Sequence, residues 1–105
     1  MDESQAIAAF AALAEPTRLR ILRFLVIEGP AGASAGEIGA AVGAASSRAS
    51  FHLSALSGAG LIVAMRQSRR MVYRVEFDAV GKLVAYLVED CCRGDARLRA
   101  CCGGS

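Results

Sequence analysis

The 105-residue sequence contains no tryptophan, and its first ninety residues contain no cysteine. Only 6% of its residues are aromatic although 54% are hydrophobic, and many of these are alanine. The core of such a small domain is thin and gains from packing against a second copy of the chain. No run of eighteen apolar residues occurs, which excludes a membrane-spanning helix. Residues 1–5 are acidic and polar, unlike a secretory signal, so we expect one cytoplasmic domain whose thiols stay reduced.

Acidic residues are absent from the middle of the chain. Residues 46–75 hold five arginines and no Asp or Glu, whereas the whole chain carries a net charge of only +2. A basic segment in a nearly neutral protein predicts a local surface for a polyanion such as DNA. The alternative is an ordinary solvated face.

The first half of the chain has the hydrophobic periodicity of three helices. The first covers residues 4–14, and the second begins at Pro16, because a helix loses no hydrogen bond to proline in its first turn. Ser34 and Glu37 have the capping-box spacing, which predicts the start of a short third helix.

The second half predicts a fourth helix, a hairpin and a last helix. The fourth helix covers residues 46–59, and strands at 61–65 and 71–77 flank a polar tip. Asp78 is the expected N-cap of the last helix. The chain is therefore predicted to be mainly α-helical with one small β-hairpin.

The same periodicity predicts which positions face the core. Apolar residues that recur every three or four positions lie on one side of a helix. The predicted core positions are Ile7, Phe10, Ala11 and Ala14 in the first helix, Leu19, Leu22, Leu25 and Val26 in the second, Ile38, Ala41 and Val42 in the third, Phe51 or Leu53, Leu56 and Ala59 in the fourth, and Val80, Leu83, Val84, Leu87 and Val88 in the last.

Two short helices joined by a glycine-containing turn and followed by a basic hairpin predict a winged helix-turn-helix, which binds DNA. At the start of the fourth helix an arginine can bind guanine, and serine or histidine can reach phosphates or base edges. The serines can also cap the helix, and the histidine can instead be partly buried. Two arginines at the hairpin tip suit the phosphate backbone or the minor groove. The predicted DNA-binding residues are Ser46, Ser47, Arg48, Ser50, His52, Arg69 and Arg70.

Two stretches resemble the ArsR/SmtB family of metalloregulatory repressors. They are Leu-Ala-Glu-Pro-Thr-Arg-Leu-Arg-Ile-Leu at 13–22, and Ser-Phe-His-Leu-Ser-Ala-Leu at 50–56 with Ala-Gly-Leu-Ile at 59–62. The resemblance implies a homodimeric winged-helix repressor that pairs through its first and last helices, binds an imperfect inverted repeat and leaves DNA when an effector binds. The family's hairpin tip usually reads Gly-Arg. Here Arg69 stands at the glycine position, which leaves the turn type open because arginine tolerates positive φ poorly.

All four cysteines form two adjacent pairs, Cys91-Cys92 and Cys101-Cys102. They lie in residues 91–105, which we expect to form an effector-binding tail after a DNA-binding and dimerisation domain at 1–90. Thiolates this close together suit a soft ion or redox chemistry. The family's other effector sites lack ligands here, because residues 37–42 contain no cysteine and the single histidine lies in the fourth helix.

The pairs resemble the vicinal cysteines of the family's arsenite and antimonite sensors. That resemblance implies three thiolates around As(III) or Sb(III), from Cys91, Cys92 and one of Cys101 and Cys102, with Cys102 slightly favoured, and no resident cofactor. The sensors have a shorter gap and a single later cysteine, so the third ligand stays open.

Other interpretations of the cysteines also stay open. Four thiolates suit a Cd-, Zn- or Pb-responsive repressor, although structural zinc prefers C-x2-4-C spacing. Two reactive pairs suit a persulfide or peroxide sensor, and a tail without function is the plainest alternative. An enzyme is not predicted, because a thiol oxidoreductase needs a C-x-x-C motif beside a βαβ unit or a base near the cysteines. A winged helix that binds a protein rather than DNA is a further alternative.

Overall fold

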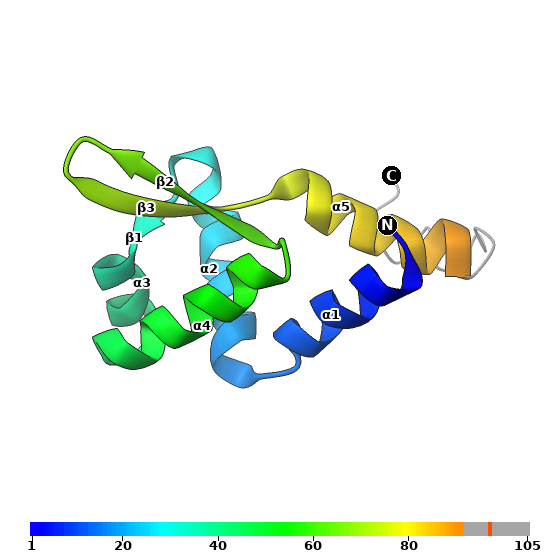
Figure 1. Cartoon of the computed structure of the whole chain (residues 1–105), viewed down its shortest axis with the longest axis horizontal. Helices are drawn as coiled ribbons and strands as arrows, with labels where there is room; N and C mark the ends of the chain where they lie inside the picture. Colours follow the sequence, from blue (N-terminus) through cyan, green and yellow to red (C-terminus); the bar gives the residue numbers. More distant parts are fainter. Residues whose placement is uncertain (92–96, 98–105) are drawn as a thin grey trace.

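The computed structural model describes residues 1–91 and residue 97, and it has the predicted order of helices and hairpin (Figure 1). The elements are α1 (Glu3–Leu13), α2 (Pro16–Glu28), the short 3-10 helix η1 (Gly29–Ala31), β1 (Ala33–Ser34), α3 (Ala35–Val42), α4 (Ser46–Gly58), β2 (Ile62–Gln67), β3 (Arg70–Val75), α5 (Phe77–Ala85) and the π-helical turn η2 (Tyr86–Cys91). The prediction of a mainly helical winged helix-turn-helix is confirmed. Within the described residues, no helix is both long enough and apolar enough to cross a membrane.

The sheet has one more strand than the predicted hairpin. Its order is β1-β3-β2 and both pairings are antiparallel, with Ala33 opposite Tyr73. β1 has only two residues, too few to produce a visible alternation in the sequence. Gly32 precedes it at φ +67, and a side chain there would collide with the backbone carbonyl oxygen of Tyr73. Glycine therefore lets this loop lie directly against β3.

Three of the helices have a side chain that caps their N-terminus. Asp2 and Gln5 form a capping box for α1, Glu15 caps α2, and the predicted capping box of Ser34 and Glu37 is present in α3. Each cap satisfies backbone N–H groups that lack a partner within the helix.

The predicted N-cap of the last helix is wrong. The N-cap lies two residues earlier, at Glu76, whose side chain makes no capping hydrogen bond, and α5 begins at Phe77. The backbone N–H of Glu76 still bonds to the carbonyl of Leu61, so sheet pairing carries the chain directly into the helix. Asp78 lies in the first turn instead, where its carboxylate interacts favourably with the positive end of the helix dipole.

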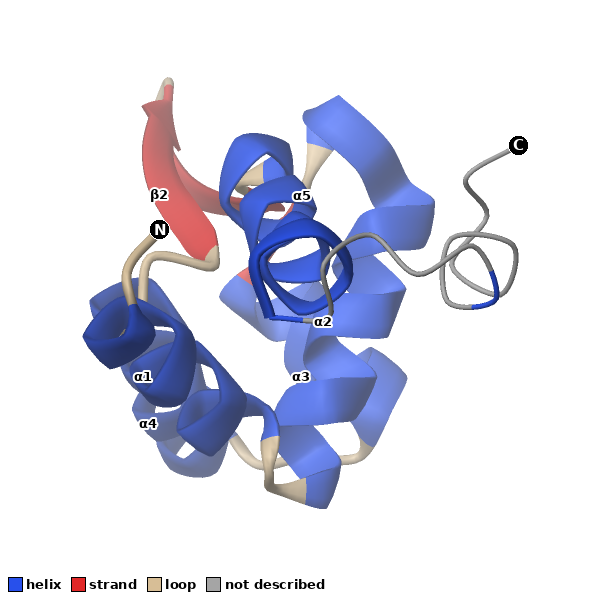
Figure 2. Ribbon diagram, turned by 90° about the vertical axis from the view of Figure 1, so that its right-hand side faces the viewer, coloured by secondary structure: helices blue, strands red, loops and turns tan. Residues whose placement is uncertain are grey.

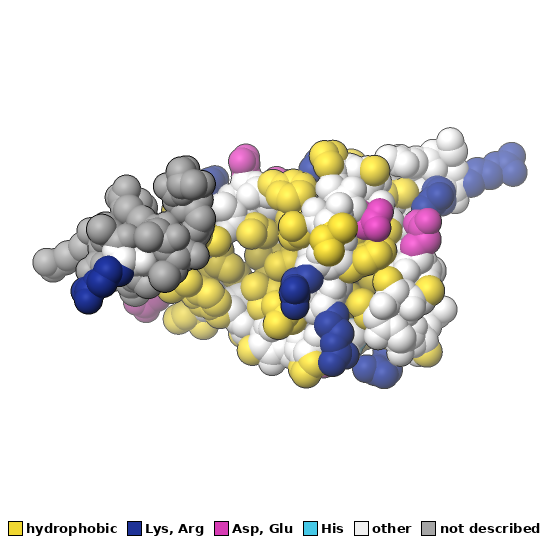
Figure 3. Space-filling model, turned by 180° about the vertical axis from the view of Figure 1, so that it is seen from behind, with side chains coloured by type: hydrophobic (Ala, Val, Ile, Leu, Met, Phe, Trp, Pro, Cys, Tyr) yellow, Lys and Arg dark blue, Asp and Glu magenta, His cyan; other side chains and the backbone are white. Residues whose placement is uncertain are grey.

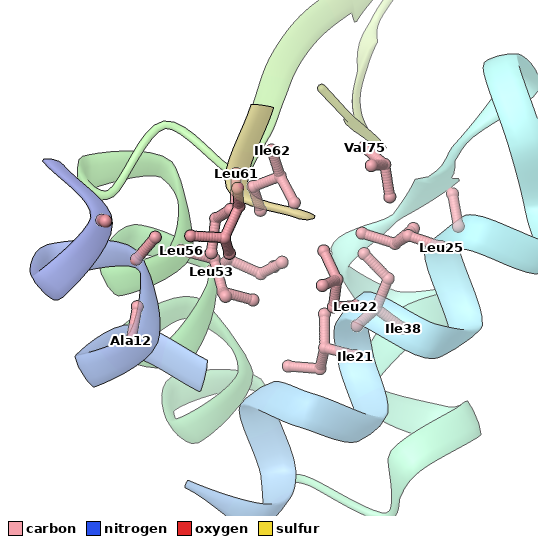
Figure 4. Close-up of a cluster of buried hydrophobic side chains, with 14 residues drawn as sticks. Ala12, Ile21, Leu22, Leu25, Ile38, Leu53, Leu56, Leu61, Ile62 and Val75 are labelled. Carbon is pink, nitrogen blue, oxygen red and sulfur yellow. The ribbon is translucent and has the colours of Figure 1, made fainter. Parts of the chain in front are cut away.

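The core lies between α1, α2, α3, α4 and the sheet, and Leu83 of α5 joins it (Figure 4). Its side chains come from helices and strands that are far apart in sequence. Their packing fixes the positions of α4 and the hairpin relative to α2 and α3. Seven predicted core residues are confirmed as buried: Leu22, Leu25, Ile38, Leu53, Leu56, Leu83 and Val88.

The predicted core face of α1 is wrong. The buried residues of α1 are Ala6, Ala9 and Ala12, while Ile7 and Phe10 are 60% and 38% exposed. Alanines let α1 approach its neighbours closely, and they leave the larger side chains outside. Ala11, Ala14, Leu19, Val26, Ala41, Phe51, Val84 and Leu87 are likewise exposed, and Val42, Ala59 and Val80 are half-buried.

The molecule has two distinct ends. The start of α4 and the β2–β3 turn lie at the left of Figure 1, and the start of α1 and the end of α5 lie at the right. Figure 2 looks onto the second end, with α1 and α5 reaching toward the viewer.

Candidate nucleic-acid interface

α4 has one face in the core and one in solvent. Ala49, His52, Leu53 and Leu56 are its buried residues. At about 100° per residue, the opposite face presents Ser47, Ser50, Phe51 and Ser54, all exposed. α4 contains no acidic residue, so nothing on this helix repels a phosphate.

Ser46 and Ser47 do not cap α4. The N-cap is Ala45, no side chain caps the helix, and the two serines are its first residues. The N–H groups of the first turn therefore have no side-chain acceptor, and the dipole there favours an anion. Two exposed hydroxyls beside these N–H groups form a set of donors that suits phosphate oxygens or base edges.

The turn between α3 and α4 is fixed by a close approach. The N–H of Ala44 donates to the carbonyl of Gly39 at 2.9 Å, and a Cβ on Gly39 would lie 2.8 Å from the carbonyl oxygen of Ala44. A larger residue at position 39 would push the turn away and tilt α4. The angle at which α4 is presented therefore depends on this glycine.

Arg48 is exposed, and its side chain also makes a hydrogen bond within the protein. Its Nη2 donates to the Oγ1 of Thr17, a buried residue in the first turn of α2, at 3.4 Å. Guanidinium carries five N–H donors, so most of them stay available to another acceptor.

His52 lies differently from the other predicted DNA-binding residues of α4. It is 7% exposed, and its Nδ1 lies 3.6 Å from Oε2 of Glu15. The backbone N–H of Arg18 is the main reason why the pKa of Glu15 is lowered, with His52 contributing less. This placement favours the buried alternative for His52 over a DNA contact, and it brings α4 close to the start of α2.

The β2–β3 hairpin, here called the wing, carries exposed arginines at its tip. Positive φ falls on Ser68, at 57°, and not on Arg69. The turn that the sequence left open thus forms without placing arginine in the left-handed region. Arg66, Arg69 and Arg70 are exposed, and Arg74 is half-buried with its Nε 3.2 Å from Sδ of Met65.

Arg70 forms an ion pair that the sequence did not reveal. Its Nη2 lies 2.7 Å from Oε1 of Glu37 at the start of α3, and both side chains are more than half exposed. The pKa of Glu37 is lowered, first by the backbone N–H of Ser34, then by the Ser34 hydroxyl, and then by Arg70. The carboxylate of Glu37 therefore both caps α3 and pairs with Arg70 of the wing.

The predicted thiolate site falls largely outside the described residues. Cys91 is the last residue of η2, and Cys92, Cys101 and Cys102 lie beyond the described part. Within residues 1–91 and 97, no group of three or more His, Cys, Asp or Glu comes together to hold a metal ion.

Three comparisons bear on identity. A helix-turn-helix domain family matches residues 13–63. The HTH-type transcriptional regulator YgaV of Escherichia coli K12 is 36% identical over 83 residues, which cover 79% of this chain and 82% of that protein. Among solved structures, the homodimeric winged helix-turn-helix DNA-binding domain of a "possible ArsR-family transcriptional regulator" from Mycobacterium bovis is 31% identical, with a TM-score of 0.67 over 81% of this chain and 77% of that one.

A further solved structure, described as a "possible transcriptional regulator for arsenical resistance", is 29% identical, with a TM-score of 0.62 over 73% of this chain and 77% of that one. The fold, the exposed start of α4 and the wing agree with these similarities. The chain belongs to the ArsR family of winged-helix DNA-binding transcriptional regulators.

Proposed function

We propose that the protein is a homodimeric repressor that binds an inverted-repeat operator and releases it when its C-terminal thiolates bind As(III) or Sb(III). One observation above all supports the proposed DNA binding. The uncapped start of α4 and the arginine-bearing wing tip lie at the same end of the molecule (Figure 1). Ser46, Ser47, Arg48 and Ser50 would contact the major groove and its phosphates. Arg69 and Arg70 would contact the adjacent backbone or minor groove.

The homodimer rests on the other end of the molecule. Exposed apolar side chains lie on α1 (Ile7 and Phe10), on α5 (Phe77 and Val84) and on η2 (Leu87). Figure 3 shows hydrophobic side chains beside this end and across the middle of the molecule, and basic side chains at the far tip of the wing and on the middle of the same face. Several large apolar residues exposed at one end of a molecule are typical of a surface that another protein covers. The similar domain from Mycobacterium bovis is described as homodimeric, which supports a second copy as the occupant.

The effector half rests on the cysteine pairs. Thiolates are the ligands that soft ions prefer, and Cys91, Cys92 and one of Cys101 and Cys102 would supply three of them. Cys91 ends η2, which directly continues α5. Ligation at this point can therefore change the proposed dimer surface of α5, and through it the spacing of the two α4 helices. The relative described as a possible regulator for arsenical resistance supports the same effector.

The test is fluorescence anisotropy on an operator duplex obtained by selection from random sequences with the reduced wild-type protein. Arsenite should weaken binding by about 5- to 150-fold, the usual range of allosteric coupling. Cys91→Ser and Cys92→Ser should bind DNA normally and lose the response. Of Cys101→Ser and Cys102→Ser, only one should lose it. Unchanged affinity at saturating arsenite and antimonite contradicts the effector assignment. A response to Cd, Zn, Pb, peroxide or polysulfide in their place identifies one of the alternatives.

A further inference from the structure

Phe51 breaks the pattern of α4. The other large apolar residues of the helix, Leu53 and Leu56, are at most 1% exposed, whereas Phe51 is 67% exposed. A single apolar side chain on a surface is common and carries no meaning alone. The position of this one within the helix is what distinguishes it.

Phe51 stands in the middle of the face that points away from the core. It follows Ser47 by one turn and precedes Ser54 by three residues, so the three lie on one side of the helix. Arg48, the only charged residue of α4, lies at the flank and is tied to Thr17. The outer face therefore offers hydroxyls and one phenyl ring, with no charged side chain at its centre.

The ring also has a fixed neighbour. Phe51 meets the His52 ring edge to face, with the ring centroids 5.4 Å apart and the planes at 68°. His52 is itself buried, with its Nδ1 3.6 Å from Oε2 of Glu15, so the ring that Phe51 contacts is enclosed by the protein. An aromatic ring supported in this way loses little conformational freedom when a ligand covers it.

We propose that Phe51 determines operator sequence by contacting the C5-methyl group of a thymine in the major groove. This inference rests on the proposed function, in which α4 lies in that groove. A phenyl ring has no donor or acceptor for a base edge, and thymine alone of the four bases presents an apolar group there. The flanking serines tolerate either kind of base because a hydroxyl both donates and accepts. Phe51 thus supplies discrimination that the serines lack.

The experiment replaces each thymine of the selected operator duplex in turn by deoxyuridine, which removes only the methyl group. Anisotropy then gives the affinity of the wild type, Phe51→Ala and Phe51→Leu for every duplex. One replacement in each half-site should weaken wild-type binding about four-fold, the worth of one buried methyl group. Phe51→Ala should bind both forms of that duplex equally, and Phe51→Leu, which is still apolar, should keep part of the discrimination.

Ser57→Ala is the matched control, because Ser57 is exposed on α4 but is not one of the residues that form the outer face around Phe51. It should reproduce the wild-type pattern of methyl sensitivity. If no position distinguishes the wild type from Phe51→Ala, or if Phe51→Ala weakens all duplexes equally and keeps every methyl effect, the inference is overturned. Failure to select any duplex with the wild type would instead overturn the proposed DNA binding. Circular dichroism confirms that each variant is folded, and Phe51→Leu decides the question if Phe51→Ala is not.

Discussion

α1 and α4 bury opposite kinds of side chain. α1 packs Ala6, Ala9 and Ala12 inward and leaves Ile7 and Phe10 exposed, whereas α4 packs its leucines inward and leaves mostly serines exposed. Burial of a large apolar side chain stabilises a fold more than burial of alanine does. A helix that keeps its large residues outside therefore gains their stabilisation elsewhere, from a molecule that covers them.

α4 follows the ordinary arrangement except at Phe51, and α1 departs from it along a whole face. In the proposals above, a thymine covers Phe51, and a second copy of the chain covers the exposed face of α1. Three changes test whether the two helices differ as proposed, beginning with the largest expected effect.

The double change Ile7→Asp and Phe10→Asp should dissociate the proposed dimer. It places two carboxylates in an apolar contact, and an uncompensated buried charge costs about 3–5 kcal/mol, so dimerisation should weaken by at least about a hundred-fold. Sedimentation equilibrium measures the dissociation constant. Phe51→Asp, at a more exposed apolar site on α4, serves as control and should leave the dimer intact. A dimer that tolerates the double change, or is lost with Phe51→Asp, would assign the interface to another surface.

Within α4, Leu56→Ala and Phe51→Ala should differ widely in stability. Leu56 is fully buried, so its truncation should lower the free energy of unfolding by about 2–5 kcal/mol. Phe51 is mostly exposed, and its truncation should change that free energy by less than about 0.5 kcal/mol. Urea unfolding at one protein concentration compares the two. Equal losses would mean that Phe51 is part of the packed core, and the argument for a DNA contact would fail.

The smallest effect is expected from Glu37→Gln. Glutamine still accepts the Ser34 N–H in the capping box but has no charge to pair with Arg70. The pKa of Glu37 is lowered from its ordinary value of 4.5, so its charge stabilises the fold above that pH, and the stabilisation is lost as pH falls below it. The wild type should therefore lose stability between pH 5 and pH 3 more steeply than Glu37→Gln, as followed by thermal melts across about this range. Parallel curves would show that the carboxylate charge contributes nothing.

The sequence predicted what depends on local signals. The capping box of Ser34 and Glu37, the start of α2 at Pro16 and the inward position of Leu56 in α4 all follow from residues within one or two turns of each other, whereas the choice between Phe51 and Leu53 stayed open. The hairpin also followed from alternating residues with a polar tip between them. These features need no knowledge of what lies across the molecule.

The features that failed or were missed depend on distant partners. α1 has apolar residues on two faces, and only its packing against α2 and α4 decides that the alanines go inward. β1 exists because Gly32 lets two residues reach β3, forty positions later in the chain (Ala33 opposite Tyr73). The contact between Glu37 and Arg70 likewise joins residues 33 positions apart. Periodicity carries no signal for such pairs.

The Glu37–Arg70 pair means that the wing already holds its own counterion. If Arg70 contacts a DNA phosphate as proposed, it would have to leave this carboxylate, so a cation released from the DNA would be offset by one drawn to Glu37. Fewer ions are then released than for an arginine without such a partner. The salt dependence of operator binding would then undercount the phosphate contacts proposed for the wing, and Arg69 would account for more of it than Arg70.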